Sequence, residues 1–424
     1  MLDIKFIRDN LDLVKAGAKK KHITVDLDRL LTVDAERRSL MVAVESARAR
    51  QNQVSQEMPQ AEAARKEELL GEMKALKEQM SQNEEKLKDV IVEWQTLMVQ
   101  VPNIPDPSVP EGDSDKGNNE VRVWGGKPQF AFAPKSHIEL MQELDMADFE
   151  RGTKVAGFRG YFLKGDGVLL SFAIWRYAQD FFLGKEFTPM IVPSLVKRVA
   201  FLGTGYLPQG EEDLYKTQDG DFLAGTGEVA TMGYYMNETV PKEQLPIKFL
   251  AFSPCFRREA GSHGKDVKGL IRVHEFYKWE QVVLCEAKHD ESVRWHEWVN
   301  RNTEEFIESL NIPYHTVLNC GGDLGLGQVK KYDIELWVPG ENTYREISSA
   351  SYFHDFQTRR LNIRYRDADG SMQYAHSLNS TAIPTPRILV SLIENYQNAD
   401  GSITIPEALR PYMGNREKIE KVRL

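Results

Sequence analysis

The residue types best suited to nucleotide chemistry are concentrated in one stretch of the chain. Residues 255–266 and 269–280 carry arginine, glutamate and histidine, and Gly261, Gly264 and Gly269 lie among them. This pattern predicts a strand, a glycine-containing loop and a second strand. Guanidinium groups bind polyphosphate and an aromatic ring suits a base, so Arg257, Arg272 and Phe276 would together suit a nucleotide. A solvated surface hairpin is the alternative.

Alternation along the second strand makes a further prediction. Successive side chains of a strand point to opposite faces, so Arg272, His274 and Phe276 would share one face. Glu280 would continue that face if no bulge intervenes.

Other kinds of chemistry lack support. The glycine run 321–327 invites a dinucleotide interpretation, but the fingerprint spacing and the flanking strand and helix are missing. The sequence also contains no Walker motif and no GxSxG nucleophile elbow. His263, His274, His354 and His376 are scattered without ligand spacing, so surface or hydrogen-bonded histidines are expected rather than metal ligands.

Composition narrows the class of protein. The 424 residues, 41% apolar and 28% charged, exclude a wholly disordered or collagen-like chain. Three widely spaced cysteines argue against a disulfide framework and favour the reducing cytoplasm. No run of eighteen apolar residues occurs, so neither a membrane span nor a secretion signal is expected. The net charge of -9 means that a nucleic-acid partner would need a local basic surface.

Residues 34–98 differ from the rest of the chain. They contain one glycine, Gly71, and one proline, Pro59, and their apolar residues recur alternately four and three positions apart. This period, sustained on both sides of Pro59, predicts an antiparallel coiled-coil hairpin. Each helix would be roughly 45 to 50 Å long, too long for one globular domain, so the hairpin would project into solvent. A packing or dimerisation strut fits the pattern as well as a binding arm does.

The segment 101–119 is rich in proline, glycine and small polar residues. It predicts a linker between an N-terminal domain, residues 1–100, and a C-terminal domain, residues 120–424. In the C-terminal domain, strands follow one another through loops too short for crossover helices, which predicts an antiparallel sheet flanked by helices, an α+β fold. The strand-like runs include 247–252, 282–285 and 334–338, and the helical runs include 169–183 and 291–310.

Three stretches in order resemble the motifs of class II aminoacyl-tRNA synthetases, and with the helical arm they resemble the seryl-tRNA synthetases of the bacterial arrangement. Residues 184–193 resemble motif 1, residues 256–280 motif 2 and residues 379–397 motif 3. The resemblance covers nearly the whole chain. It implies the class II antiparallel sheet, an N-terminal tRNA-binding arm, and a homodimer with the motif 1 proline at its interface.

The resemblance also implies a reaction. ATP would activate L-serine to seryl adenylate, and the seryl group would pass to the 3' end of serine tRNA in the cytoplasm, with Mg²⁺ as the metal. Two alternatives remain. An adenylating paralogue would load a carrier protein or would have lost tRNA charging. A non-enzymatic coiled-coil protein would leave Arg257, Glu280 and Arg387 without a reason.

Each site residue is assigned by the same resemblance. Arg257 would bridge the amino-acid carboxylate and the α-phosphate, and Arg387 would face adenine opposite Phe276, which makes the two arginines the catalytic residues. The residues implied for ATP are Arg257, Glu259, Arg272, Val273, Phe276, Glu346, Ser349 and Arg387. Those implied for serine are Thr226, Glu228, Arg257, Glu280, Asn379 and Thr381. Glu346 and Ser349 would hold magnesium, for which hard oxygen donors are suited.

A site that bonds the serine hydroxyl would reject alanine through unmet hydrogen bonds, by about 10⁴-fold or more in favourable cases, and threonine by size. The sequence departs from the commonest family pattern at Gly225, Gly227, Tyr352 and residues 379–381. The hydroxyl, carboxylate and guanidinium positions are intact, so the chemistry is expected to be retained.

Overall fold

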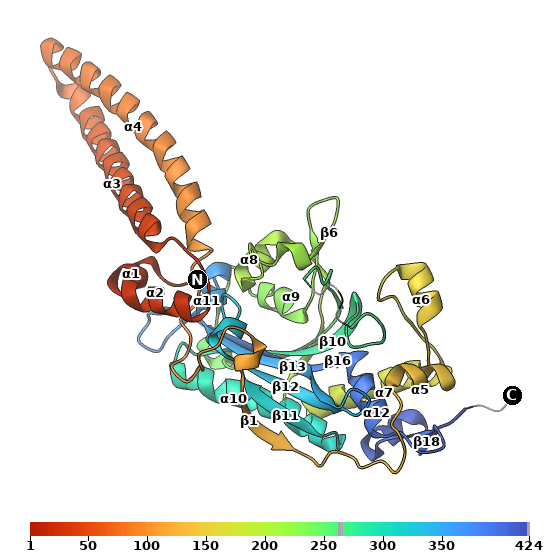
Figure 1. The fold of residues 1–424 in the computed structure, drawn as a ribbon. Coiled ribbons are helices and arrows are strands. Elements are labelled where there is room, and N and C mark those ends of the chain that lie inside the picture. The colour runs from red at the N-terminus through yellow and green to blue at the C-terminus, as the bar shows by residue number, and fades with distance from the viewer. Residues whose placement is uncertain (262–263, 265, 422–424) are drawn as a thin grey trace. The chain divides into compact units, whose positions relative to one another are not determined.

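The computed structural model describes residues 1–261, 264 and 266–421. Ser262, His263 and Lys265, which fall in the predicted motif 2 loop, lie outside the described residues. The chain divides into two compact units (Figure 1). The helical unit comprises residues 3–19 and 23–102, and the sheet unit comprises residues 1–2, 20–22 and 103–424.

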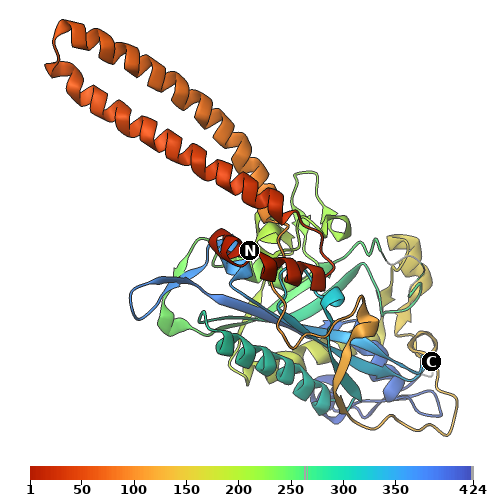
Figure 2. The same cartoon turned by 60° about the vertical axis from the view of Figure 1, so that its left-hand side comes forward.

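The helical unit contains the predicted hairpin. Helices α1 (Ile4–Asp9) and α2 (Leu11–Lys20) precede α3 (Leu27–Glu57) and α4 (Ala63–Met98), and η1 (Met58–Gln60) forms the turn at Pro59. The two long helices run side by side (Figure 2). Along both long helices, the positions that recur four and three residues apart are buried or half-buried. Among them, Val54 and Leu69 are fully buried. The coiled-coil prediction is therefore confirmed.

Charge pairs join the two long helices along their length. Arg29 pairs with Glu93 at 2.7 Å and Arg48 pairs with Glu84 at 3.0 Å. At the start of the hairpin, the fully buried Asp34 carboxylate accepts hydrogen bonds from three arginines, Arg8, Arg37 and Arg38. A buried carboxylate needs such partners, because an unpaired charge is costly to bury.

The sheet unit is built on one eight-stranded sheet of order β1-β11-β12-β13-β16-β10-β9-β4. Neighbouring strands are antiparallel except β4 and β9, which are parallel. The prediction of an α+β fold with an antiparallel sheet is confirmed. The exception is the edge strand β4, which pairs with β9 in parallel. The strands are β1 (Asn119–Trp124), β4 (Thr188–Ile191), β9 (Ile247–Phe256), β10 (Glu275–Cys285), β11 (Tyr314–Leu318), β12 (Lys330–Val338), β13 (Thr343–His354) and β16 (His376–Thr385).

Helices cover both faces of this sheet. On the back face, α7 (Gly165–Leu183), α10 (His289–Ser309) and α12 (Arg387–Asn395) enclose the main apolar core with inward residues of the strands, such as Trp279 and Val283. On the front face, α8 (Arg198–Thr204), α9 (Gly227–Gly233) and α11 (Phe356–Leu361) pack as a second group (Figure 1).

Shorter elements complete the sheet unit. They are α5 (His137–Glu143), β2 (Ala147–Asp148), α6 (Phe149–Ala156), β3 (Phe162–Leu163), β5 (Leu195–Val196), β6 (Tyr215–Lys216), β7 (Phe222–Leu223), β8 (Thr239–Val240), β14 (Arg364–Arg366), β15 (Met372–Tyr374), β17 (Ile403–Thr404), β18 (Lys418–Ile419) and the 3-10 turns η2 (Asp115–Gly117), η3 (Glu211–Asp213), η4 (Lys242–Gln244), η5 (Gly321–Asp323) and η6 (Glu407–Met413). Across the described ranges, no helix has both the length and the apolarity needed to cross a membrane.

Two β-bulges adjust which residues reach the front face. In β13, Ile334 pairs with Ser348 and Glu335 with Glu346, so Ile347 is the extra residue. Glu346 and Ser349, three positions apart, consequently line the same cavity. In β16, the extra residue is Ala382, because Trp279 pairs with Ile383 and Glu280 with Thr381.

Candidate active site

A cavity of about 310 Å³ opens on the front face of the sheet. Its walls come from strands β10, β13 and β16, the start of helix α9, the end of α8, the loop after η5, and Arg257, which directly follows β9. All the residues predicted for serine and both predicted for magnesium line it: Thr226, Glu228, Arg257, Glu280, Glu346, Ser349, Asn379 and Thr381. The structure therefore brings together side chains that are up to about 150 positions apart in the sequence.

The floor of this cavity is a buried ion pair. Lys278 and Glu280 alternate on the front face of β10, and the Lys278 ammonium contacts the Glu280 carboxylate. Lys278 Nζ also donates to Thr226 Oγ1 at 2.8 Å and to Thr381 Oγ1 at 3.3 Å. Both charged side chains are almost fully buried, so each depends on the other and on these hydroxyls.

Asn379 offers an unfilled acceptor beside this pair. Its Nδ2 donates to Glu280 Oε1 at 3.3 Å, and Thr226 Oγ1 donates to Glu280 Oε2 at 3.2 Å. The Asn379 Oδ1 atom is buried and has no hydrogen-bond partner among the described groups. Since buried polar atoms are normally hydrogen-bonded, this oxygen suits a donor group of a bound ligand.

Glu228 provides a second carboxylate with a different environment. It follows Thr226, the N-cap of α9, and accepts hydrogen bonds from Tyr206 Oη at 3.0 Å and Gln357 Nε2 at 2.6 Å. Burial raises the pKa of Glu228 from 4.5 to about 7, and the two donors oppose that rise. Glu228 is therefore close to half-ionised near neutral pH.

A smaller hollow of about 50 Å³ adjoins the cavity. It is lined by Arg257, Glu259, Val273, Phe276, Glu346 and Arg387, all predicted for ATP. Arg257, Lys278, Glu346 and Thr381 line both the hollow and the larger cavity. The two spaces are thus neighbouring compartments of one cleft.

Two guanidinium groups are oriented by backbone oxygens in this hollow. Arg387 Nε donates to Ile271 O at 2.7 Å and Nη1 donates to Glu346 O at 3.0 Å. Burial lowers the pKa of Arg387 from its usual value. Arg257 Nε donates to Gly225 O at 3.2 Å, and its guanidinium carbon lies 5.2 Å from the centre of the Phe276 ring.

Arg272 lies beside the hollow. Its guanidinium forms ion pairs with Glu259 and, at 3.5 Å, with Asp266. Glu259 lines the hollow and has a backbone φ of 57°, in the left-handed region that a glutamate rarely adopts. A phosphate group would compete with these carboxylates for Arg272.

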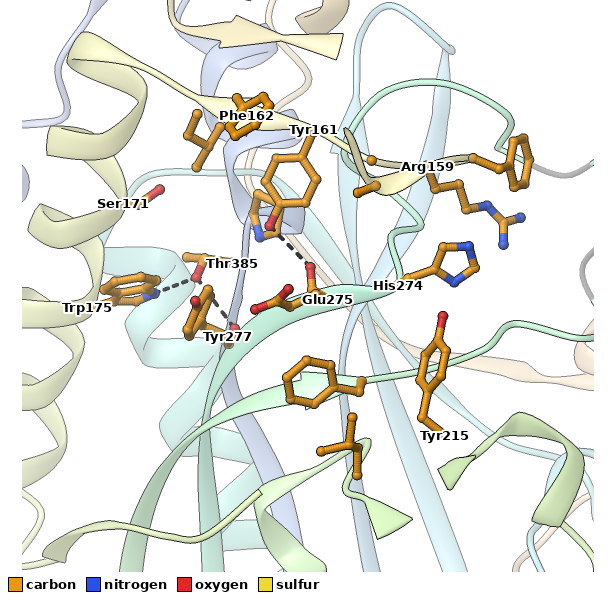
Figure 3. A pocket seen from close by; sticks show the side chains of 17 residues that line it. Arg159, Tyr161, Phe162, Ser171, Trp175, Tyr215, His274, Glu275, Tyr277 and Thr385 are labelled. Carbon is orange, nitrogen blue, oxygen red and sulfur yellow. Dashed lines mark hydrogen bonds between the residues drawn. The ribbon is translucent and has the colours of Figure 1, made fainter. Parts of the chain in front are cut away.

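The predicted shared face is wrong for His274. Strand β10 begins at Glu275, so the alternation that places Phe276 and Glu280 together does not extend back to His274. His274 instead lines a separate cavity of about 620 Å³ with Tyr161, Trp175 and Tyr277 (Figure 3). Several aromatic rings line that cavity, and Tyr161 Oη donates to Glu275 O at 3.2 Å.

Glu346 and Ser349 pass a simple test for Mg²⁺. Both present hard oxygen atoms to the same cavity, and the Glu346 carboxylate forms no ion pair within the described part of the chain. Clusters of three or more acidic, histidine or cysteine ligands are absent from the described residues. Mg²⁺ commonly takes one or two carboxylates and completes its shell with water and substrate phosphates, so a small donor set fits it.

Sequence reasoning missed Lys278, Tyr206 and Gln357. Lys278 lies two positions from both Phe276 and Glu280, so strand alternation would have placed it on the same face. Tyr206 and Gln357 reach Glu228 from α8's C-terminal side and from α11, and such long-range contacts leave no local signal.

Comparison with known proteins first defines a class. Residues 215–396, which contain most of the cleft, match the family model for the tRNA synthetase class II core domain (G, H, P, S and T). Residues 1–105 match the model for the seryl-tRNA synthetase N-terminal domain.

Individual relatives narrow the class. The chain is 44% identical to the serine-tRNA ligase of Deinococcus radiodurans over 98% of both chains, and 42% identical to that of Trichlorobacter lovleyi over 99% of this chain and all of the relative. A crystal structure of the seryl-tRNA synthetase from Pyrococcus horikoshii complexed with ATP matches all of both chains with a TM-score of 0.92 and 37% identity. The chain belongs to the seryl-tRNA synthetase family.

Proposed function

We propose that this protein activates L-serine with ATP and transfers the seryl group to serine tRNA. The observation that carries the proposal is the position of Arg257, which lines both compartments of the cleft. A planar guanidinium there faces the amino-acid end and the nucleotide end at once, so it can hold a carboxylate against a phosphate in attacking geometry.

The larger compartment binds serine. The ionised Glu228 carboxylate and the Thr226 hydroxyl receive the serine ammonium group. The serine hydroxyl meets Glu280, Asn379 and Thr381, where the free Asn379 Oδ1 accepts its hydrogen bond. The ion pair with Lys278 holds the Glu280 carboxylate in place.

The smaller compartment binds ATP. Phe276 and Arg387 hold the adenine between them, Glu259 and Val273 lie beside it, and Arg272 receives the terminal phosphate. The carboxylate oxygen of serine attacks the α-phosphorus, the bond to the bridging oxygen breaks, and pyrophosphate leaves with the bonding electrons. Arg257 and Arg387 hold the oxygens on which charge develops. Mg²⁺, held by Glu346 and Ser349, would neutralise phosphate charge when bound.

In the second step, the terminal ribose hydroxyl of tRNA attacks the seryl carbonyl and AMP leaves. We assign tRNA capture to residues 1–100, with 101–119 as the linker and 120–424 as the catalytic domain. The arm can bind tRNA although the protein as a whole is acidic. Contacts to the RNA backbone and recognition of RNA shape need only a local set of lysines and arginines.

We further propose a homodimer that works in the cytoplasm. The edge strand β4, which lies in the motif 1 stretch, and the preceding helix α7 expose large apolar side chains, among them Ile191 at 85% and Phe172 at 56% of their surface. Exposed apolar groups on an open sheet edge favour association with a second copy of the chain.

The adenylating paralogue remains the alternative, and the long hairpin argues against it. The deciding experiment is a charging assay with total tRNA and radiolabelled serine. Acid-precipitable seryl-tRNA supports the proposal. Serine-dependent pyrophosphate exchange without any charging would favour the paralogue instead.

A further inference from the structure

The glycine run that fails as a dinucleotide motif, residues 321–327, has a structural role beside the cleft. Its last part, with Gln328, lines the larger cavity together with Thr226 and Glu228. Gly321 and Gly327 permit close packing: a Cβ on Gly321 would lie 2.1 Å from Lys20 O, and one on Gly327 would lie 2.7 Å from the Phe356 ring. Loop 325–328 therefore lines the cavity with Gly327 at a position where a Cβ has no room against Phe356.

Two residues hold the backbone of loop 325–328. Lys21 Nζ donates to Gly325 O at 3.0 Å, to Leu326 O at 3.1 Å and to Gln328 O. Asn103 donates from its backbone N to Leu326 O at 2.9 Å and from Nδ2 to Gly327 O at 3.0 Å. All four consecutive carbonyl oxygens of the loop thus accept hydrogen bonds from Lys21 or Asn103.

The Lys21 ammonium is matched to this task. Lys21 is 3% exposed, and its three N–H groups meet three carbonyl oxygens. A buried ammonium is costly unless such acceptors surround it, so the loop conformation and the cation depend on each other. Gln328 continues the network, since its Oε1 accepts from Gly325 N and its Nε2 donates to Ser351 Oγ at 2.8 Å, and Ser351 also lines the cavity.

Lys21 and Asn103 occupy special places in the chain. Both belong to the sheet unit, and the chain leaves that unit for the long hairpin after residue 22 and returns to it at residue 103. The loop is consequently held at the two points where the hairpin is attached to the sheet unit. A lysine far from the motifs, in a run of lysines at residues 19–21, gives no sequence signal of this contact.

We infer that Lys21 is a positioning residue for serine binding: it fixes the backbone of loop 325–328 and thereby the shape of the amino-acid compartment. This inference rests on the proposed function and adds a residue outside the class II core to the serine site. The loop lines the larger cavity and is absent from the lining of the adenine hollow, so Lys21 acts on serine rather than on ATP.

The test uses the full-length variant Lys21→Met, which keeps the length of the side chain and removes its donors. Pyrophosphate exchange should show a serine KM raised by on the order of tenfold or more, with the ATP KM unchanged. Lys21→Arg should recover part of the loss, because it retains N–H donors. Lys20→Met is the matched control, since Lys20 pairs only distantly, at 3.7 Å, with the exposed Glu111 carboxylate.

A second variant, Asn103→Ala, tests the inference independently if Lys21→Met does not fold. It should also raise the serine KM. An unchanged serine KM in both variants, or equal rises in the serine and ATP KM, would overturn the inference. Hydrogen exchange at amides 325–328 gives a readout that does not depend on activity. Exchange there should accelerate in Lys21→Met and not in Lys20→Met. If hydrogen exchange at these amides is unaltered in Lys21→Met, the inference is overturned. If instead the wild-type protein shows no serine-dependent pyrophosphate exchange, the proposed function is overturned.

Discussion

The Lys278 ammonium and the Glu280 carboxylate form a buried ion pair at the floor of the cleft, two positions apart on one face of β10. Glu280→Ala would leave Lys278 buried without its counter-charge, which costs about 3–5 kcal/mol of stability. The isosteric Glu280→Gln variant should fold with a smaller loss but lower serine-dependent exchange by on the order of 10³-fold. Pyrophosphate exchange and thermal unfolding measure the two effects. ATP affinity is the internal control, and a Glu280→Gln variant with wild-type serine kinetics would exclude Glu280 from serine binding.

The pKa of Glu228 predicts how serine binding depends on pH. Burial raises that pKa to about 7, so the carboxylate ionises as the pH rises through neutrality and then attracts the serine ammonium. Serine affinity, measured by calorimetry between pH 6 and 8, should increase with pH in the wild type and be flat and weak in Glu228→Gln. The raised pKa also means that the native state binds more protons than the unfolded state between pH 4.5 and 7, so this group's contribution to stability falls as the pH rises across that window. A wild-type affinity independent of pH would contradict the assignment.

Histidines that are scattered in the sequence meet next to α10. The His289 and His354 rings are joined by a contact of 3.2 Å, and the His354 and His376 ring centres lie 4.9 Å apart. Burial, with a smaller contribution from neighbouring histidines, lowers the pKa of both His354 and His376 to about 4.

These histidines predict a loss of stability in acid. His354 and His376 protonate less readily in the folded protein than in the unfolded chain, so stability is lost as the pH falls from 6.5 towards 4. For one such group, the loss between pH 7.5 and 5.5 is about 1 kcal/mol. We expect the free energy of unfolding, measured with urea, to differ between the two pH values by about 1 kcal/mol less in His354→Leu than in the wild type. An identical pH dependence in wild type and variant would show that His354 does not titrate in this way.

Removal of the Glu346 carboxylate should change the requirement for metal. In Glu346→Ala, the Mg²⁺ concentration for half-maximal exchange should rise about tenfold or more, because a hard anionic ligand is lost. Glu341→Ala is the matched control, since Glu341 is exposed and its ion pair among the described residues is with Arg345, at 3.5 Å. Titration of the variants with Mn²⁺, followed by its paramagnetic resonance signal, reports metal affinity directly. Equal metal affinity in the two variants would remove Glu346 from the metal site.

The hairpin can be shortened without disturbing the attachment points. Replacing residues 45–86 by a short Gly-Ser turn keeps the Arg29–Glu93 pair and the Arg37–Trp94 contact of 4.7 Å. Because Lys21 and Asn103 are also retained, serine-dependent pyrophosphate exchange should persist while tRNA charging falls by at least about 100-fold. Loss of both activities together would count against a separable tRNA-binding arm.

Much of the architecture could be predicted from periodic patterns. The hairpin, its turn at Pro59 and its seam follow from a 3.5-residue repeat that the burial of Val54 and Leu69 confirms. The site residues were found through motifs rather than through geometry, because the bulges at Ile347 and Ala382 set which residues share a face. Simple alternation cannot anticipate a bulge, and it failed for His274, which lies outside the strand.

Contacts between segments far apart in the chain could not be predicted from the sequence. Gln357 reaches Glu228 across about 130 positions, and Lys21 reaches loop 325–328 across about 300, and neither contact follows from local propensity or spacing. The same holds for the glycine run 321–327. Its glycines allow close packing against Lys20 and Phe356, and only the structure shows these neighbours.

Formation of seryl adenylate in the cleft is measured by amino-acid-dependent exchange of pyrophosphate into ATP, with each of the twenty amino acids in turn. We predict the strongest exchange with serine and exchange at least about 100-fold weaker with alanine and threonine. Serine-dependent exchange should be lost in Arg257→Ala. Exchange that is absent with serine, or stronger with another amino acid, would contradict the account.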